Sequence, residues 1–258
     1  MSTLENIPND IAVFVVTHKS FNLPQEAVLV PIQVGNGIGL GYISDNQLDN
    51  IADKNPFFSE LTALYFIWKN IKTPIIGLVH YRRYFVFKQN IVFWRLNQIA
   101  YHLNLNAKQQ TKRLQILNRH TILQALKNAD MIIPSPLVLG MTVYEHYDKC
   151  HHIKDWNIIQ KILATKFPEY LLTMNQVEQG NILYPYNMFI GRKNIMDKYC
   201  EWLFDILFEA EKFIDYSQYN SYNQRVFGFL SERLFTVWFF HHQEQYRFKH
   251  FFVELMKE

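Results

Sequence analysis

A histidine, two tyrosines and two adjacent arginines follow an apolar run directly in the stretch HYRRY, residues 80–84. The run before them, residues 74–79, predicts a short buried strand, because buried strands are rich in aliphatic residues. In open α/β sheets, ligands bind just beyond the carboxyl ends of the strands. Adjacent guanidinium groups at that place can grip a phosphate or diphosphate through paired hydrogen bonds. Alternatively, Arg82 and Arg83 pair with carboxylates and His80 is a hydrogen-bonded core residue.

Two glutamates lie in apolar surroundings, where a surface carboxylate is not expected. Glu60 lies in a predicted helix and either pairs with an arginine of residues 80–83 or binds the ligand itself. Glu232 lies among phenylalanines and leucines of another predicted helix. It is either ion-paired with Arg225, on the same helical face, or a catalytic base whose pKa is raised by burial.

Residues 144–155 form the densest ionisable cluster of the sequence. On one helix, Asp148 and His152 would share a face, as would His151 and Asp155. The cluster lacks the spacing of a tetrahedral zinc site. Hydrogen bonds to the hydroxyl groups of a substrate, or a histidine general base near neutral pH, are the better interpretation.

The sequence contains none of the common metal or phosphate motifs, including HExxH, the nucleophile elbow, the Walker loop and the kinase set. It also lacks the acidic DxD pair. The glycine-rich residues 35–41 do not have GxGxxG spacing, so a flexible turn is the better interpretation. Asp45, Asp49 and Asp53 stand four apart, and such carboxylates repel one another unless a cation such as Lys54 lies between them. The pattern permits a divalent cation but does not indicate one, and we expect that no cofactor is required.

The composition indicates a folded chain with a sizeable core. Of its 258 residues, 49% are hydrophobic and 19% charged, which excludes a disordered chain. The net charge of +3 is dispersed, so no nucleic-acid partner is expected. The aromatic residues either fill the core or favour nucleotide and carbohydrate ligands. The two cysteines, Cys150 and Cys200, lack ligand spacing and fit a reduced intracellular chain.

The two ends of the sequence bear on its location. We expect no signal peptide in residues 1–10 and no transmembrane helix. The aromatic-rich residues 235–242 either attach to a membrane surface or pack the last helix onto the core, and packing is preferred because the polar face is not strongly basic. The expected location is the cytoplasm, with at most peripheral contact at the inner face of the cell membrane.

The elements that must position these residues follow from apolar periodicity and from capping residues. We expect one α/β domain over residues 1–258, with residues 90–119 inserted as a lid. Three helix starts are predicted from capping residues. Asn55 with Pro56 begins a helix over residues 55–70, Thr121 begins a short helix, and Asp155 caps a helix over residues 156–167. The remaining predictions are strands at 11–16, 28–32, 131–133 and 186–190, a short helix from Pro168, and helices at 193–211 and 223–240.

Taken together, these stretches resemble a bacterial family of capsule, exopolysaccharide and lipopolysaccharide biosynthesis glycosyltransferases. The family was long labelled a domain of unknown function and includes galactofuranosyltransferases. The segments ELTALY at 60–65 and HYRRYF at 80–85 are the specific matches. Weaker matches lie in order between residue 11 and about residue 240, at Thr17-His18-Lys19, Asp49-Asn50-Ile51, Lys54-Asn55, Trp68-Lys69-Asn70, Ala129-Asp130, Tyr147 with His152, Asn187-Met188-Phe189-Ile190, and residues 225–233.

The resemblance implies a GT-A-like, Rossmann-type mixed sheet flanked by helices, with a helix-rich C-terminal half. It implies transfer from a UDP-hexose, or from UDP-galactofuranose, to a glycan or lipid-linked oligosaccharide acceptor. A non-catalytic nucleotide- or glycan-binding protein on the same scaffold is the alternative. The missing DxD departs from the usual pattern, so arginine charge would stabilise the leaving diphosphate instead.

The same resemblance assigns roles to residues of this sequence. Glu232 is the candidate base, with His152 and Asp148 next. The residues expected to bind the donor are Thr17, His18, Lys19, Lys54, Asn55, Glu60, His80, Tyr81, Arg82, Arg83, Asn187 and Arg225.

Overall fold

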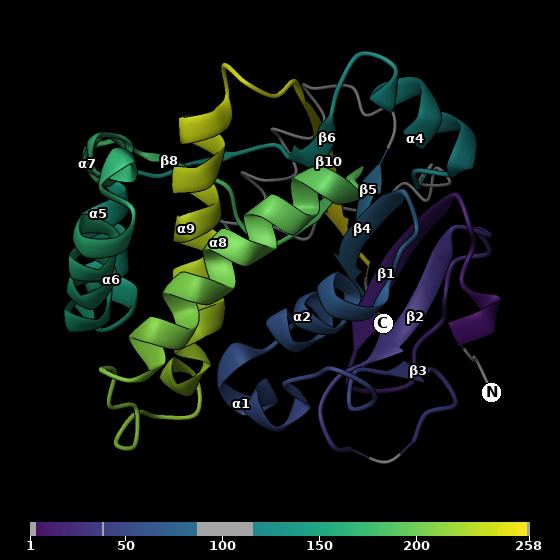
Figure 1. Cartoon of the computed structure of the whole chain (residues 1–258), viewed down its shortest axis with the longest axis horizontal. Helices are drawn as coiled ribbons and strands as arrows, with labels where there is room; N and C mark the ends of the chain where they lie inside the picture. Colours follow the sequence, from purple (N-terminus) through teal and green to yellow (C-terminus); the bar gives the residue numbers. More distant parts are fainter. Residues whose placement is uncertain (1–3, 38, 87–115, 257–258) are drawn as a thin grey trace, which may run out of the picture.

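The computed structural model describes residues 4–37, 39–86 and 116–256 (Figure 1). Its sheet begins with four parallel strands in the order β3-β2-β1-β4. They are β1 (Ile11–Thr17), β2 (Leu29–Gln33), β3 (Ile43–Ser44) and β4 (Ile75–His80). Every residue of β1 and β2 is buried, which explains why the two sequences are nearly continuous apolar runs rather than alternating ones.

The rest of the sheet curves back on β4 and closes. The strands are β5 (Arg83–Val86), β6 (Met131–Pro134), β9 (Phe189–Arg192) and β10 (Phe248–Leu255). β5 pairs with β4 and β10, β10 with β6, β6 with β9, and β9 returns to β4. The fold is therefore an α/β fold whose mixed parallel and antiparallel sheet is partly closed into a five-stranded barrel. A separate pair consists of β7 (Leu137–Val138) and β8 (Ile182–Leu183).

Two glycines allow the barrel to close tightly. A Cβ at Gly77 in β4 would lie 2.7 Å from Cγ1 of Ile190 and 3.1 Å from the carbonyl oxygen of Phe189. A Cβ at Gly191 in β9 would lie 2.7 Å from Cγ of Met131. Both distances are shorter than ordinary packing contacts, so glycine is required where β9 meets β4 and β6.

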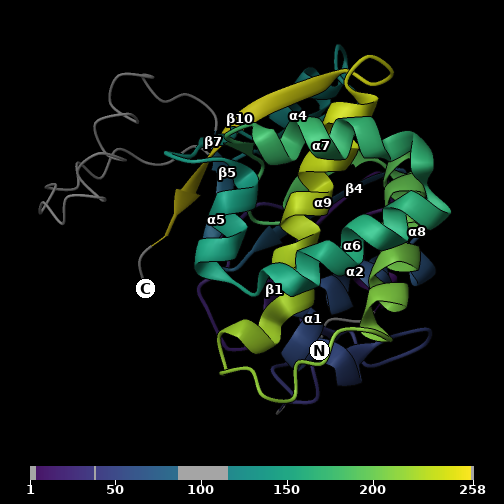
Figure 2. The ribbon, with the colours of Figure 1, turned by 90° about the vertical axis from the view of Figure 1, so that its left-hand side faces the viewer.

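Helices cover both faces of the sheet. Successive residues of β1 point to opposite sides: Phe14 packs in a core with α2, α8 and α9, whereas Val13 packs with α4. Figure 2 shows α5, α6 and α7 as an outer layer over α8 and α9. The bounds are α1 (Asn55–Phe58), α2 (Leu61–Asn70), α4 (Arg119–Leu126), α5 (Val143–Cys150), α6 (Ile153–Lys166), α7 (Leu171–Gln179), α8 (Lys193–Glu211) and α9 (Val226–His242). Short 3₁₀ turns lie at Leu4–Asn6, Ala52–Lys54, Pro168–Tyr170 and Asn223–Arg225.

The predicted helix over residues 55–70 is two helices. Ser59, with φ 52°, breaks it between α1 and α2. Lys54, and not Asn55, occupies the N-cap position. The Asn55 amide instead donates to the Ser59 carbonyl oxygen (2.9 Å) and to Oγ1 of Thr62 (3.2 Å), which holds the break in shape.

Two other predicted caps are also wrong. Asn118 is the N-cap of α4, and Thr121 is its capping-box partner. His152 is the N-cap of α6, whereas Asp155 is buried and accepts from the Tyr219 hydroxyl (2.8 and 3.0 Å). In both cases the helix begins one turn earlier than the sequence suggested, and the residue predicted as its N-cap lies inside the first helical turn.

Strand predictions failed where the backbone turns. Tyr186 and Asn187 have φ values of 80° and 49°, so β9 begins at Phe189 and not at residue 186. β10 was not predicted. Of the aromatic-rich residues 235–242, residues 235–239 are buried, as the packing interpretation requires, and residues 240–242 are half-buried. Residues 90–115 of the predicted lid lie outside the described residues. No helix in the described parts of the chain is both long and apolar enough to cross a bilayer.

Candidate functional site

The parallel strands place two of the predicted binding segments side by side. β1 lies between β2 and β4, so the strand order reverses at the carboxyl ends of β1 and β4. Val16 is in register with His80, and the Tyr81 amide donates to the Val16 carbonyl oxygen (3.0 Å). Residues 17–19, after β1, therefore adjoin residues 80–83. This reversal point is where open α/β sheets bind ligands.

The HYRR segment is a tight hairpin rather than a simple exit from the sheet. His80 pairs with Arg83 across the turn, and the chain re-enters the sheet as β5. The Tyr81 ring is surrounded by positive charge: Nζ of Lys19 lies 5.4 Å and Cζ of Arg82 5.0 Å from its centroid. His18 packs edge-on against the same ring at 5.5 Å. Cationic side chains that follow β1 and β4 are thus brought together around the hairpin.

Arg83 and His80 turn toward the loop before β9. The Arg83 guanidinium lies 4.8 Å from the Tyr186 ring centroid. His80 Nε2 lies 2.6 Å from the Tyr186 carbonyl oxygen, so this nitrogen carries the proton. Burial lowers the pKa of His80, and the Glu60 carboxylate partly opposes this effect. His80 is therefore a neutral, hydrogen-bonded residue at pH 7, as its structural alternative proposed.

A buried polar network joins Glu60 to α9. Glu60 Oε1 accepts from Asn187 Nδ2 (2.7 Å), and Asn187 Oδ1 accepts from the Ser231 hydroxyl (3.0 Å). Asn187 Nδ2 also approaches the Gly228 carbonyl oxygen (3.3 Å). The hydrogen-bond partner of Glu60 is thus an amide rather than an arginine of residues 80–83. Because these groups are buried and satisfied, they fix α2, α9 and the loop before β9 relative to one another.

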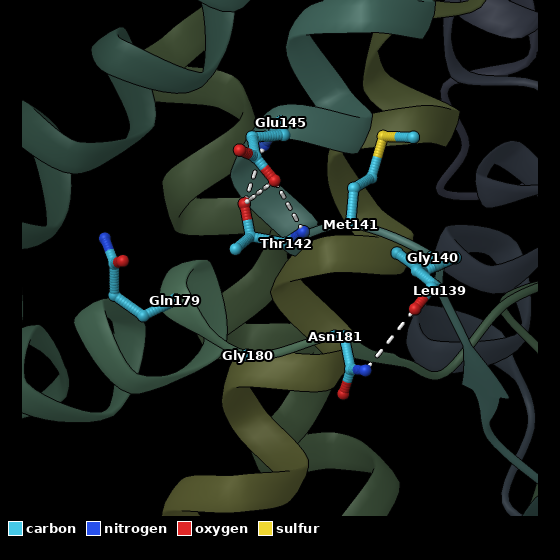
Figure 3. A pocket seen from close by; sticks show the side chains of 8 residues that line it. All are labelled: Leu139, Gly140, Met141, Thr142, Glu145, Gln179, Gly180 and Asn181. Atoms are coloured by element: carbon cyan, nitrogen blue, oxygen red, sulfur yellow. Dashed lines mark hydrogen bonds between the residues drawn. The ribbon is translucent and has the colours of Figure 1, made fainter.

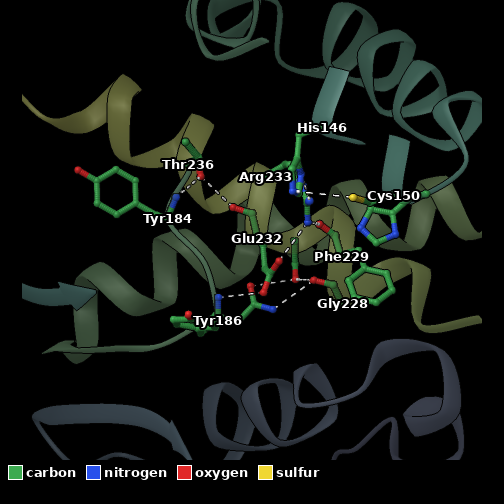
Figure 4. Close-up of polar contacts among 12 residues, drawn as sticks. His146, Cys150, Tyr184, Tyr186, Gly228, Phe229, Glu232, Arg233 and Thr236 are labelled. Carbon is green, nitrogen blue, oxygen red and sulfur yellow. Dashed lines mark hydrogen bonds and ion pairs between the residues drawn. The ribbon is translucent and has the colours of Figure 1, made fainter. Parts of the chain in front are cut away.

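Glu232 lies next to this network (Figure 4). Its Oε1 accepts from the Tyr186 amide (2.9 Å), and its Oε2 is 3.0 Å from NH1 of Arg233. Burial raises the pKa of Glu232, and Arg233 opposes the shift. The ion-pair partner is therefore Arg233 and not Arg225, whose Nε donates to the Ser59 hydroxyl (3.0 Å).

Three predicted donor-binding residues have their side chains in structural contacts. The Thr17 hydroxyl donates to the Lys19 carbonyl oxygen (2.6 Å) and accepts from the Lys19 amide (3.1 Å), which shapes the turn after β1. Lys54 forms an ion pair with Glu211 (2.5 Å), and the Asn55 amide closes the break before α2. Their predicted contacts with a donor remain predictions.

The histidine cluster does not lie on one helix. α5 ends at Cys150 and α6 begins at Ile153, so Asp148 and His152 do not share a helical face. Asp148 is exposed, and His152 stacks on Tyr219 at 4.0 Å.

Two other histidines of that cluster, His146 and His151, were not predicted as site residues, and they face α9 instead. His146 Nδ1 lies 3.1 Å from NH2 of Arg233 (Figure 4). The His151 ring stacks on Phe229 with a centroid distance of 4.1 Å. The sequence signal that could have found them is Arg233 itself, because an arginine inside an apolar helix needs buried partners.

A pocket lies where α5 begins (Figure 3), and its lining includes none of the predicted site residues. Glu145 and Thr142 there bond to each other in a capping box, so their polar atoms are already paired. For this reason we place the candidate site at the hairpin and Glu232. The pocket is lined by Leu139, Gly140, Met141, Thr142, Glu145, Gln179, Gly180 and Asn181.

The described residues do not bring three or more histidine, cysteine, aspartate or glutamate side chains together as metal ligands. Of the three spaced aspartates, Asp45 is buried and accepts from the Gly35 amide (3.0 Å), while Asp49 accepts from the Tyr65 hydroxyl (3.1 Å). These carboxylates are thus used separately and do not form the shared cation site that their spacing permitted.

The fold and the candidate site together define an α/β protein with cationic side chains gathered at the strand-order reversal. Residues 12–244 match the family described as a domain of unknown function, DUF4422, and the chain belongs to this family. Among solved structures, the apo form of the bifunctional glycosyltransferase WbbM is similar, with 28% sequence identity and a TM-score of 0.82. The match covers 97% of this chain and 46% of that one, so the chain spans about half of WbbM. No curated protein matches the chain.

Proposed function

We propose that the chain is a glycosyltransferase that moves a sugar from a nucleotide-diphosphate donor to a glycan acceptor in cell-surface polysaccharide synthesis. The observation that carries the proposal is the juxtaposition of Arg83, one of the two hairpin arginines, with Glu232. Tyr186 links the two sides, because its ring contacts Arg83 and its amide donates to Glu232. The similarity to WbbM, whose title describes a bifunctional glycosyltransferase, supports the same class.

The donor is proposed to lie across the carboxyl ends of β1 and β4, in a GT-A-like arrangement. A diphosphate there would meet Lys19, Arg82 and Arg83 around the Tyr81 ring. Preorganised cations favour the charge that develops on a leaving diphosphate, so they would lower the barrier without a metal ion. A UDP-hexose or UDP-galactofuranose is the proposed donor.

Glu232 is the proposed general base. The acceptor hydroxyl oxygen would form a bond to the anomeric carbon, the bond from that carbon to the diphosphate would break, and the hydroxyl proton would pass to Glu232. Burial raises the pKa of Glu232 above its ordinary value and so brings it closer to the working pH. Such a pKa suits a group that must accept a proton at pH 7.

The test is Glu232→Gln, which keeps the shape of the side chain and removes its charge. Release of UDP from UDP-glucose, UDP-galactose or UDP-galactofuranose should be lost, while thermal stabilisation by UDP stays close to that of the unmodified protein. Glu178→Gln is the matched control, because Glu178 is also a buried, hydrogen-bonded glutamate, held by Trp156 (2.6 Å) and Gln160 (2.7 Å). Normal turnover by the Glu232 variant would transfer the role to His152.

The second candidate function is non-catalytic binding of a nucleotide or glycan. It is favoured by the number of predicted site residues whose charges are already paired, such as Lys54 with Glu211 and Glu232 with Arg233. Nucleotide binding without any donor turnover, with or without acceptor, would favour this function over transfer.

A further inference from the structure

One stripe of helix α9 stays accessible although the helix is otherwise buried. Between Val226 and Phe239, every residue is buried except Phe229 and Glu232. Arg225, just before the helix, is exposed. Spacings of four and three residues place Arg225, Phe229 and Glu232 along one face. This face therefore presents a cation, an aromatic ring and a carboxylate in sequence.

Two further rings extend the Phe229 surface. The His151 ring stacks on Phe229 with a centroid distance of 4.1 Å, and the Tyr222 ring lies 4.9 Å from Phe229. Tyr222 and His151 are nearly parallel, with 13° between their planes. Tyr222 is 54% exposed. Three separate elements, the α5–α6 junction, the turn before α9 and α9 itself, thus bring rings together beside solvent.

Polar groups lie around this three-ring stack. His151 Nδ1 donates to Asn223 Oδ1 (3.3 Å), which makes Nε2 the acceptor nitrogen of the ring. Burial lowers the pKa of His151 to about 4, so the ring is neutral at pH 7. The Arg225 guanidinium lies 5.6 Å from the Phe229 centroid. Glu232 is three residues beyond Phe229, about 4.5 Å along the helix axis.

We propose that Tyr222, Phe229 and His151 form a subsite for a sugar ring of the acceptor, with one hydroxyl directed at Glu232. Aromatic faces pack against the C–H faces of sugars, while nearby charged and hydrogen-bonding groups select the hydroxyls. The subsite rests on the proposed function, because it defines an acceptor only if Glu232 serves transfer.

The position of Glu232 explains why the three-ring stack suits the acceptor and not the donor. Figure 4 shows Glu232 between Tyr186 and Phe229. Tyr186 contacts Arg83 of the hairpin, so the cations proposed for the diphosphate lie on the Tyr186 side. A sugar on the Phe229 side would approach the base from the opposite direction, as an incoming hydroxyl does in an in-line displacement.

The test is saturation-transfer NMR with three probes: methyl β-D-galactopyranoside, methyl β-D-glucopyranoside and methyl α-D-mannopyranoside. At least one should receive saturation on its ring C–H protons from the unmodified protein. Tyr222→Ala and Phe229→Leu should each weaken its titrated binding by about fivefold or more. Phe213→Ala is the matched control, because Phe213 is an exposed ring (62%) outside the stack. Unchanged binding in both stack variants, verified as folded by thermal unfolding, would overturn the subsite.

A UDP arm separates this inference from the proposed function. UDP should raise the melting temperature of the unmodified protein and of all three variants equally, and it should leave the glycoside signal in place. Displacement of the glycoside by UDP would make the stack part of the donor site and overturn the inference. UDP binding without any glycoside contact would overturn the subsite alone. Glycoside binding that is lost in the stack variants, without binding of any nucleotide, would keep the sugar subsite and overturn the transferase.

Discussion

Replacing Arg233 by methionine should destabilise the protein in a way that depends on pH. Arg233 is 2% exposed and donates to Oε2 of Glu232 (3.0 Å), the Phe229 carbonyl oxygen (3.1 Å) and His146 Nδ1 (3.1 Å). Methionine fills a similar volume but leaves the Glu232 carboxylate unpaired. Removing one partner of a buried ion pair costs about 3–5 kcal/mol. We expect the cost to lie at the lower end of this range near neutral pH, because the Glu232 side chain is still 20% exposed.

The pH dependence follows from Glu232. Its pKa in the folded protein is already raised by burial, and Arg233 is the main group that opposes the rise. In Arg233→Met the folded pKa rises further, so the native state keeps a proton that the unfolded chain loses above its ordinary pKa. Stability then falls with increasing pH, by at most about 1.4 kcal/mol per pH unit, until the folded pKa is passed. The loss relative to the unmodified protein is therefore larger at pH 8 than at pH 5.

Urea unfolding at pH 5 and pH 8 measures this effect. A double-mutant cycle compares four proteins: the unmodified chain, Arg233→Met, Glu232→Gln and the double variant. We expect the free-energy loss of Arg233→Met to exceed its pH 5 value by about 1 kcal/mol or more at pH 8. The double variant has no carboxylate to titrate, so this increment should disappear. His146 loses its partner in both Arg233 variants, so its own titration cancels between them.

Two results would refute this reasoning. One is an equal loss of stability at both pH values in Arg233→Met. The other is a double variant that keeps the increment, which would assign the titration to a group other than Glu232. Either result would mean that Arg233 does not hold Glu232 in its charged form.

Arg82→Ala and Arg83→Ala should each reduce turnover of a UDP-hexose at least about tenfold, or about 1.4 kcal/mol of transition-state stabilisation, in folded protein; full activity in both variants would make the arginines structural. Turnover should survive EDTA and gain little from Mg²⁺ or Mn²⁺, whereas loss that Mn²⁺ restores would reveal a metal site. Gly77→Ala should lower the free energy of unfolding by about 1–3 kcal/mol, because the new methyl group would meet Ile190, while Gly140→Ala, with open space around it, should change little.

Local patterns were sufficient where one segment determines its own structure. The amphipathic residues 193–211 predicted α8 with the bounds that the structure has, and the apolar runs predicted β1 and β4. β10 could not be predicted, because its residues do not alternate regularly between buried and exposed. Its pairing depends on β5 and β6, which lie far away in the sequence.

The same distinction holds for the candidate site. The hairpin residues and Glu232 were identified from their own neighbours in the sequence. The partner of Glu232 was misassigned to Arg225, because both lie on one helical face, whereas the folded side chain pairs with the adjacent Arg233. His146 and His151 reach α9 only through the packing of the outer helical layer, and residues 87 positions apart meet there. Such long-range contacts leave no local pattern to read.

The position of β10 in the barrel has a consequence for biosynthesis. β10 follows every other described strand in the sequence, yet it lies between β5 and β6. A ribosome therefore releases the hairpin arginines long before the strand that secures one side of β5 exists. Domains generally fold as units as they emerge. A nascent chain that stops short of residue 248 would leave the barrel open, so β5 gains its second neighbouring strand only after residues 248–255 have been made.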